Sequence, residues 1–357
     1  MSEWKEVKLG DLVSIKYGKD HKSLSDGVFP VFGSGGLMRK VDSYIYDKPS
    51  LLIPRKGTLN NIIYTEEKFW TVDTMFWTKV DELKTSAKFL YYYLKDFNFN
   101  ALNVGSAVPS LTVPVLNDID IKLPSTDKQS DIVGILSSLD AKIETNNKLN
   151  EKLEEMAQAI FKSWLDGCDE TVQIDDLSLN ITDYSKLNKD KVILINSSDV
   201  TNGFFDHHNY SDNNKLKGHF KKRFSKGDIL YSQVRPRNRH WAYCYFDAED
   251  YIASTQLMVI RNNPEKVSSL LLYQYLISDR VWNEFTLKTE TRSGTFPQGN
   301  YEDLSKICVP YKKDNEKISK TLEHIYNIIY NRYDENQRLA SLRDTLLPRL
   351  MSGELIV

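Results

Sequence analysis

The sequence predicts an α+β protein in which two strand-rich α/β domains are each followed by one long helix. The segment NEKLEEMAQAIFKSWL, residues 150–165, is echoed 186 positions later by NQRLASLRDTLLPRLM, residues 336–351. In both segments apolar residues recur at alternating spacings of three and four, which is typical of a helix that packs on another helix. Before each helix, short apolar runs alternate with Gly, Asn and Asp turns, a pattern typical of strands. We therefore expect a pseudo-twofold internal repeat whose two helices pair antiparallel as a coiled coil.

The predicted domain order follows from this repeat. With 357 residues, the chain is long enough for two separate cores. We expect a first domain at 1–124, a long helix at 125–166, a second domain at 167–310 and a second long helix at 311–357. Three shorter segments support the duplication: KEVKLGDL at 5–12 resembles ETVQIDDL at 170–177, SLLIPRKG at 50–57 resembles DILYSQVR at 228–235, and FLYYYL at 89–94 resembles LLYQYL at 271–276.

Polar and helix-breaking residues in the long helices carry further expectations. Asn150 and Asn336 occupy equivalent positions on the apolar stripes, where a buried Asn fixes the register of paired helices. The alternative is a frayed or solvent-facing turn. Pro348 removes a backbone donor, so we expect a kink or the onset of termination there. Each helix is expected to end near a glycine in the left-handed conformation, Gly167 and Gly353.

Composition excludes several classes of protein. The 47 basic and 49 acidic residues give a net charge of -2, so nucleic-acid binding would depend on local patches. Three cysteines, Cys168, Cys244 and Cys308, form no CxxC pair, which suits a reducing compartment. The N-terminal sequence lacks an apolar signal core, and no run approaches the roughly 18 apolar residues that cross a bilayer. We therefore expect a cytoplasmic protein with no membrane association.

Motifs of catalysis are missing from the sequence. There is no GxxxxGK[ST] loop, no HExxH helix and no GxSxG turn. No Pro-Pro dipeptide occurs, so the chain lacks the Asp/Asn-Pro-Pro-aromatic motif of amino-methyltransferases. Asp47, Glu66 and Lys68 allow a metal-dependent nuclease as an alternative, although an exposed charged turn is the ordinary explanation of such residues. The FGSGG segment, residues 32–36, lacks the GxGxxG order of a phosphate cradle and favours a sharp turn.

Local clusters of basic and amide side chains favour contact with DNA. Lys and Arg neutralise phosphates, whereas Arg, Asn and Gln form paired hydrogen bonds with base edges. In the second domain the candidate DNA-binding residues are Lys221, Lys222, Arg223, Gln233, Arg235, Arg237, Asn238, Arg239, Arg292 and Ser293. In the first domain they are Lys19, His21, Lys22, Arg39, Lys40, Arg55, Lys56, Thr58, Asn60 and Asn61. Solvated charged loops remain the alternative interpretation. No catalytic residue and no metal ligand is expected in this chain.

These features resemble the specificity subunits of type I restriction-modification systems. The resemblance covers nearly the whole chain, through the order of domain, helix, domain, helix. Three segments are also similar: FPVFGSGG followed by SLLIPRKG, the FWTVDTMF run, and the ending LRDTLLPRLMSGEL. The second domain matches less well, because it lacks the glycine turn and the Arg-Lys-Gly.

The resemblance implies a non-catalytic DNA-binding subunit. Its two domains would be target recognition domains, each reading one half of a bipartite site in double-stranded DNA. Its helices would set the gap between half-sites and dock two modification (methyltransferase) subunits, and restriction (translocase/nuclease) subunits would complete the complex. S-adenosylmethionine, ATP and Mg²⁺ would belong to those partners, with no cofactor on this chain. The alternative from another class is a coiled-coil scaffold that binds only protein, which leaves the arginine-rich loop unexplained.

Overall fold

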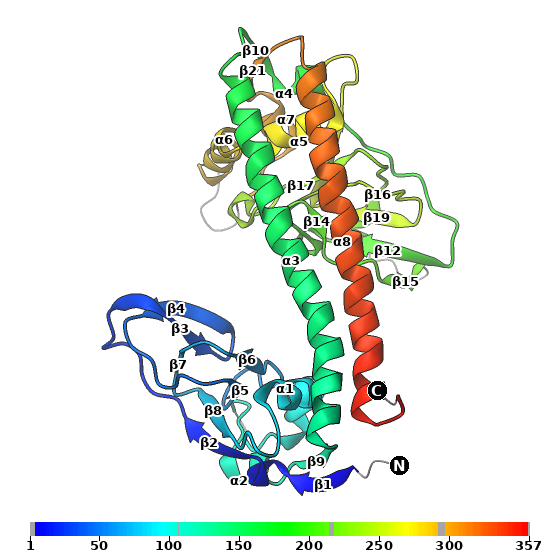
Figure 1. Cartoon of the computed structure of the whole chain (residues 1–357). Helices are drawn as coiled ribbons and strands as arrows, with labels where there is room; N and C mark the ends of the chain where they lie inside the picture. Colours follow the sequence, from blue (N-terminus) through cyan, green and yellow to red (C-terminus); the bar gives the residue numbers. More distant parts are fainter. Residues whose placement is uncertain (1–3, 106, 214–217, 292–296, 356–357) are drawn as a thin grey trace. The chain divides into compact units, whose positions relative to one another are not determined.

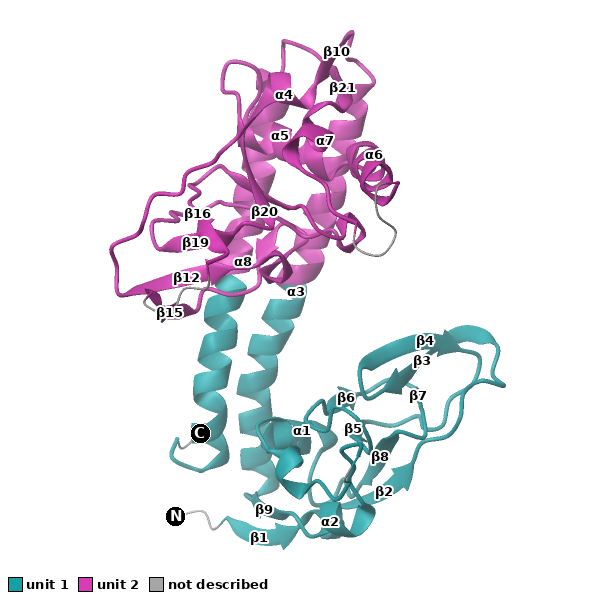
Figure 2. Cartoon of the chain, turned by 180° about the vertical axis from the view of Figure 1, so that it is seen from behind, with its two compact units in different colours: residues 1–145, 335–357 teal, residues 146–334 magenta. Residues whose placement is uncertain are grey.

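The structure, a computed structural model, describes residues 4–105, 107–213, 218–291 and 297–355. Contacts divide the chain into two compact units, coloured separately in Figure 2. Unit 1 consists of residues 1–145 and 335–357, and unit 2 consists of residues 146–334. Each unit therefore contains a strand-rich part together with a length of both long helices (Figure 1).

Unit 1 contains a four-stranded antiparallel sheet in the order β2-β8-β5-β6. A three-stranded sheet, β4-β3-β7, and a two-stranded ribbon, β1-β9, complete its strands. The elements are β1 (Lys5–Lys8), β2 (Val13–Tyr17), β3 (Asp26–Gly33), β4 (Gly36–Val41), β5 (Ser50–Pro54), β6 (Ile63–Thr65), β7 (Trp70–Thr71), β8 (Met75–Val80), α1 (Ala87–Lys95), α2 (Val113–Asn117) and β9 (Asp120–Leu123).

Unit 2 repeats the antiparallel sheet as β11-β20-β17-β18 and the ribbon as β10-β21. Its second sheet, β15-β12-β19-β16, contains the parallel pair β12-β19, and β13-β14 form a small ribbon. The elements are β10 (Glu170–Gln173), α4 (Ile174–Leu177), β11 (Ser178–Asn180), β12 (Lys191–Ile195), β13 (Val200–Thr201), β14 (Phe204–Phe205), β15 (Tyr210–Asp212), β16 (Phe220–Lys222), β17 (Ile229–Ser232), β18 (Trp241–Tyr243), β19 (Tyr251–Ser254), β20 (Leu257–Asn262), α5 (Ser269–Ile277), α6 (Asp279–Glu290), α7 (Tyr301–Ser305) and β21 (Cys308–Tyr311).

The duplication read from the sequence is confirmed at the level of single elements. The matched segments form β1 and β10, β5 and β17, and α1 and α5. Both globular helices begin at a serine cap, because Ser86 Oγ accepts the Phe89 N–H at 3.1 Å and Ser268 Oγ accepts the Leu271 N–H at 3.2 Å. All residues of β5 and β17 are buried, as expected for the inner strands of a sheet.

Two long helices, α3 (Thr126–Leu165) and α8 (Glu316–Met351), are present as predicted. Pro348 lies inside α8, which ends three residues later, so this proline stands at the onset of termination. Gly353 follows with φ 76°, whereas Gly167 is not among the residues with positive φ, so the expected left-handed ending is wrong for α3. Among the described residues, no helix is both long enough and apolar enough to span a membrane.

The apolar stripes of the long helices contribute to the core of each unit. In unit 1, Ile132 and Leu136 of α3 share a buried cluster with Leu347 and Leu350 of α8. In unit 2, the corresponding cluster contains Phe161 of α3 and a longer set from α8: Ile318, Leu322, Ile325 and Ile329. Burial of these side chains removes apolar surface from water, which stabilises the folded state by about 25 cal/mol for each Å² that is buried. Within each unit the two helices therefore pack as part of the domain core.

A polar contact in unit 1 joins the globular part to both long helices. Tyr92 on α1 donates its hydroxyl to Asp140 on α3 at 2.6 Å. Arg343 on α8 donates to the other oxygen of Asp140 at 2.7 Å. Such charge-assisted hydrogen bonds are directional, so they favour one orientation of these three helices about their contact.

Unit 2 has a polar contact with the same connectivity and different chemistry. Gln274 on α5 donates to the Tyr326 hydroxyl on α8 at 2.6 Å, and this hydroxyl donates to Glu154 Oε1 on α3 at 2.8 Å. Gln274 aligns with Tyr92 between LLYQYL and FLYYYL, and Tyr326 lies 186 residues after Asp140. Two of the three residues in each contact thus stand at repeated positions, whereas Glu154 and Arg343 do not correspond by the same offset.

The free energy of unfolding is expected to depend on pH through Glu154. Burial raises the pKa of its carboxyl above the ordinary value of 4.5. At a pH between the ordinary pKa and the raised pKa, the Glu154 carboxyl is protonated in the folded state and ionised in the unfolded chain. The free energy of unfolding therefore falls as pH rises through this window. Comparing urea unfolding of wild type and Glu154→Gln across this range should show a flatter pH dependence in the variant. Equal slopes would contradict the assignment.

Candidate nucleic-acid interface

The arginine loop, residues 233–240, connects β17 to β18 in unit 2 and contains a short 3-10 turn. Its backbone is left-handed at Arg235, with φ 45°, and at Arg239, with φ 53°. Non-glycine residues adopt this conformation only where surrounding contacts fix it, at a cost of order 1–3 kcal/mol each. Here the Arg235 N–H donates to the Pro297 carbonyl at 2.9 Å, and Trp282 Nε1 donates to the Pro236 carbonyl at 2.8 Å. The loop is therefore rigidly held, which suits a recognition surface.

Two guanidinium groups of the arginine loop are oriented by carboxylates on α6. Arg237 Nη2 donates to Glu290 at 2.7 Å, and this carboxylate raises the pKa of the arginine. Arg239 Nη2 donates to Asp279 at 3.0 Å, and its guanidinium carbon lies 4.0 Å from the centre of the Trp282 ring. In the sequence these arginines appear unopposed, but the fold supplies acidic partners that lie about 40 or more residues away. Their charge is therefore partly balanced before any ligand binds.

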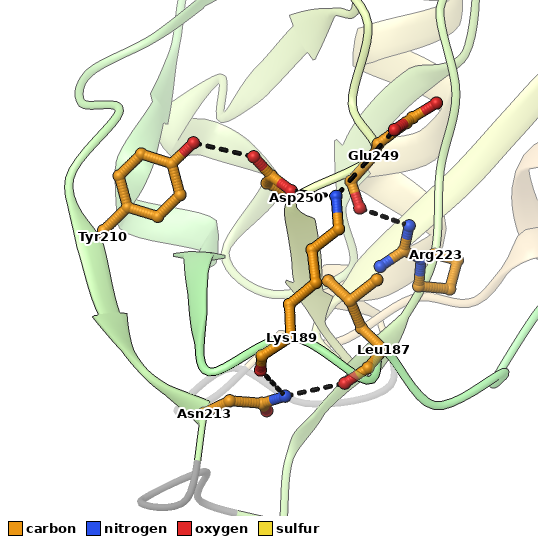
Figure 3. Close-up of polar contacts among 7 residues, drawn as sticks. All are labelled: Leu187, Lys189, Tyr210, Asn213, Arg223, Glu249 and Asp250. Carbon is orange, nitrogen blue, oxygen red and sulfur yellow. Dashed lines mark hydrogen bonds and ion pairs between the residues drawn. The ribbon is translucent and has the colours of Figure 1, made fainter.

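Arg223 belongs to a polar network near β19, drawn in Figure 3. Its Nη2 donates to the Glu249 carbonyl at 2.7 Å. Lys189 forms an ion pair with Asp250, which also accepts the Tyr210 hydroxyl at 2.7 Å (Figure 3). These hydrogen bonds lower the pKa of the Asp250 carboxyl. Arg223 itself is half-buried, and the Glu249 carbonyl holds its guanidinium group.

Lys222 is a correction to the predicted surface. Its side chain is buried at 6% exposure, and its ammonium donates to the Leu257 carbonyl at 2.6 Å. Burial also lowers the pKa of this lysine. The alternation of side chains along β16 explains the difference, because Lys221 is exposed and its neighbour faces the interior. Lys222 is therefore not positioned to reach a phosphate.

Lys221 and Lys222 provide a matched test of the predicted DNA-binding surface. We expect Lys221→Ala to weaken binding to a duplex several-fold and to reduce the slope of log affinity against log salt by about 0.9. Lys222→Met should leave that slope unchanged, because its ammonium does not reach solvent. Fluorescence anisotropy at several salt concentrations measures both slopes. A larger effect from Lys222→Met in a folded protein would contradict the placement.

In unit 1, the loop after β5, residues 55–61, occupies the position of the arginine loop. Arg55 Nη1 donates to the Asp73 carbonyl at 3.1 Å, and its guanidinium carbon lies 5.4 Å from the centre of the Tyr17 ring. Lys56 is exposed, and Gly57 adopts φ 91°, which requires glycine here. The loop thus presents an ordered arginine and an exposed lysine.

The FGSGG segment forms the tight turn between β3 and β4, with Gly36 at φ 112°. A strand follows the turn, so the helix N-terminus of a phosphate cradle is absent from this described segment. Asn61 donates to the Ser34 carbonyl at 2.8 Å and so ties the turn to the 55–61 loop. His21 and Lys22 line a cavity of about 560 Å³ beside the same turn. The structure therefore brings three segments of unit 1 together, namely the FGSGG turn, the 55–61 loop and the segment that contains His21 and Lys22.

The other predicted residues of unit 1 are less closely grouped. Arg39 donates to the Leu24 carbonyl at 2.6 Å and is half-buried. Lys40 lines a different cavity, of about 870 Å³. The remaining predicted residues that are exposed are Lys19, Thr58 and Asn60 in unit 1 and Arg235 and Asn238 in unit 2. Gln233 is half-buried. Arg292 and Ser293 lie outside the residues that the structure describes.

An arrangement common to both units is not visible in the sequence. In unit 2, the arginine loop pairs with residues 297–299 through the bridge between Val234 and Gln298. In unit 1, the 55–61 loop pairs with the segment before α2 through the bridge between Lys56 and Ser110. In each unit, the basic loop thus lies beside a segment that is more than 50 residues away in the sequence.

Aromatic residues that support these loops were missed by sequence reasoning. Tyr17 lies under Arg55 and Trp282 lies under Arg239, so each limits the rotamers of its arginine. Each pair is separated by about 40 residues, and no local motif signals such a contact.

The metal-dependent nuclease alternative gains no support from the geometry. Glu66 accepts from Lys88 at 3.2 Å, and the Lys68 ammonium lies 4.8 Å from the centre of the Tyr44 ring. Among the described residues, no group of three His, Cys, Asp or Glu side chains is placed to hold a metal ion.

A duplicated strand-rich fold with a basic loop in each unit suits a nucleic-acid-binding protein. A family model described as "Type I restriction modification DNA specificity domain" matches residues 1–155 and 170–340. The chain belongs to this family of type I DNA specificity proteins, for which DNA sequence specificity is the defining role. This membership argues against the alternative of a scaffold that binds only protein.

Individual relatives agree with this assignment. The type I restriction enzyme HindI specificity subunit of Haemophilus influenzae is 34% identical over 176 residues, which cover 48% of this chain and 38% of that protein. The EcoDI specificity subunit of Escherichia coli is 23% identical over an alignment covering 99% of this chain and 89% of that protein. The crystal structure of a type I S subunit from M. genitalium has a TM-score of 0.67 at 15% identity, covering 98% of this chain and 96% of that chain, and confirms the α+β fold.

Proposed function

We propose that this chain is the specificity subunit of a type I restriction-modification complex and that each unit reads one half of a bipartite DNA site. The observation that carries the proposal is the repeated pairing of a basic loop with a polar segment, once in each unit. In unit 1, Lys56 pairs with Ser110. In unit 2, Arg235 follows Val234, which pairs with Gln298. Such a surface combines cations for phosphates with amide and hydroxyl groups for base edges.

The long helices support a second part of the proposal, that they set the gap between half-sites. A continuous helix rises about 1.5 Å per residue, so its length is a fixed distance. Two modest interfaces on one rigid spacer gain effective concentration only at DNA sites with the matching separation. The helices also offer docking surfaces for two modification subunits, which would bring S-adenosylmethionine and the methylation chemistry. Restriction subunits with ATP and Mg²⁺ would complete the complex.

The experiment that tests this function compares methylated adenines in a host with and without this gene. The modification partner is expressed in both strains, and single-molecule sequencing reads the methylated positions. A new bipartite motif that requires this gene is the expected result. No new motif, with a partner shown to be competent beside another specificity subunit, would overturn the proposal.

A further inference from the structure

A cavity of about 490 Å³ in unit 2 is lined by residues of α3 and α8, by aromatic side chains of the strand-rich part and by Arg239 of the arginine loop. Its volume falls within the roughly 300–1,000 Å³ typical of small-ligand sites. Polar side chains of α3 line one side, including Asn150 and Glu154. Aromatic side chains line another, including Phe204, Trp241 and Tyr273.

Glu154 is a half-buried carboxylate without a cation. Its Oε1 accepts from Tyr326 at 2.8 Å and from Gln158 at 3.4 Å, and it forms no ion pair with any described residue. Its second oxygen, Oε2, makes no hydrogen bond within the part of the chain that the structure describes. A half-buried carboxylate whose hydrogen bonds come only from neutral donors keeps part of its desolvation cost, because no nearby positive charge offsets it.

Asn150 adds an acceptor on the same face of α3. Its amide nitrogen donates to the Ile329 carbonyl at 3.2 Å, while its Oδ1 is buried and has no hydrogen-bond partner among the described residues. Residues four apart on a helix are neighbours, so Asn150 and Glu154 present acceptors to one place. A buried acceptor left unpaired costs about 1–3 kcal/mol. The cavity wall therefore offers two acceptor atoms that make no hydrogen bond within the described residues, Asn150 Oδ1, which is buried, and Glu154 Oε2.

The charge of the cavity wall is negative. Glu151 and Glu154 line it, and the single arginine of the lining, Arg239, already pairs with Asp279 at 3.0 Å. Aromatic faces such as Trp241 attract a cation that lies over them. Negative charge, unpaired acceptors and aromatic walls together select a cation with several N–H donors.

We propose that this cavity binds a guanidinium group, with Glu154 Oε2 and Asn150 Oδ1 as its acceptors. A guanidinium carries five N–H donors in one plane, so it can satisfy both acceptors and lie against an aromatic face at once. The group can come from a free small molecule or from an arginine side chain of a bound protein. The second source rests on the proposed function, because the modification subunit is the protein partner tested.

The first arm of the experiment uses the purified full-length chain and N-acetyl-arginine methylamide as the probe. Saturation-transfer NMR compares this probe with N-acetyl-citrulline methylamide, which has the same shape without the charge. Glu154→Gln removes the charge but keeps an acceptor for Tyr326, and it should weaken probe binding about tenfold. Glu155→Gln is the matched control, because Glu155 is exposed, pairs with Lys152 at 2.7 Å and lies outside the cavity lining.

The second arm measures the affinity of the modification subunit for the same three proteins. Probe binding that is lost only in Glu154→Gln supports a free guanidinium ligand. Undetectable probe binding, with partner affinity about tenfold weaker only in Glu154→Gln, supports an arginine of the partner. Equal behaviour of Glu154→Gln and Glu155→Gln in both arms would overturn the cavity proposal. If the modification subunit fails to bind even the wild type, the proposed function fails, and the probe arm alone decides the cavity.

Discussion

Removal of one heptad from each long helix is expected to shorten the gap in the methylated motif by about three base pairs. Deleting residues 141–147 of α3 and 336–342 of α8 retains the Asp140–Arg343 contact of unit 1 and the Asn150–Ile329 contact of unit 2. Seven residues correspond to about 10 Å of helix, and DNA rises about 3.4 Å per base pair. A whole heptad preserves the phase of the apolar stripes, so the helices can still pair. Methylome sequencing of the deletion strain gives the new gap directly.

A matched insertion controls for damage to the complex. Duplicating residues 141–147 and 336–342 should lengthen the gap by about the same amount, with both half-sites unchanged. Because α3 and α8 also carry Asn146 and Asn336 in these segments, and both residues are buried, the pair of variants tests whether helix length or a particular residue matters. Methylation at the original spacing in both variants would contradict the proposed ruler.

Replacement of Tyr326 by Phe is expected to lower the free energy of unfolding by about 2 kcal/mol. The substitution keeps the ring but removes the hydroxyl that joins Gln274, at 2.6 Å, to Glu154, at 2.8 Å. Gln274 is 1% exposed, so its amide would lose a hydrogen bond without gaining water. Urea denaturation of the purified protein measures the loss.

Two further variants make this result specific. Tyr184→Phe removes a hydroxyl from a side chain that is 55% exposed, so its effect should stay within about 0.5 kcal/mol. Combining Gln274→Leu with Tyr326→Phe removes the unpaired donor as well as the hydroxyl. The double variant should recover part of the stability lost by Tyr326→Phe, because replacing both partners costs less than leaving one unpaired. No recovery would indicate that lost packing, and not the hydrogen bond, causes the effect.

Local pattern was sufficient to predict the long helices and the repeat. The three- and four-residue spacing around Ile132 and Ile318 expresses the 3.6-residue turn of a helix, which is a property of consecutive residues. The similarity of SLLIPRKG to DILYSQVR placed β5 and β17 correctly, because both strands are buried segments of similar composition.

The candidate site could be predicted only as sets of basic residues. Lys221 and Lys222 are adjacent and chemically identical, yet only the neighbours of β16 decide that one is exposed and the other buried. Arg237 and Arg239 read as unopposed charges, whereas α6 supplies Glu290 and Asp279 from beyond the next strands. Charge balance at these positions depends on contacts across tens of residues, which local sequence does not encode.

The sequence by itself determined the α+β class, the duplication, the two long helices and the family, because these depend on periodicity and on motifs of neighbouring residues. Only the tertiary structure decided which basic side chains face solvent and which loops lie together. It also decided that Glu154 and Asn150 share a cavity with aromatic walls. These outcomes depend on burial and on contacts between distant segments, and the free energy of each group is set by those neighbours.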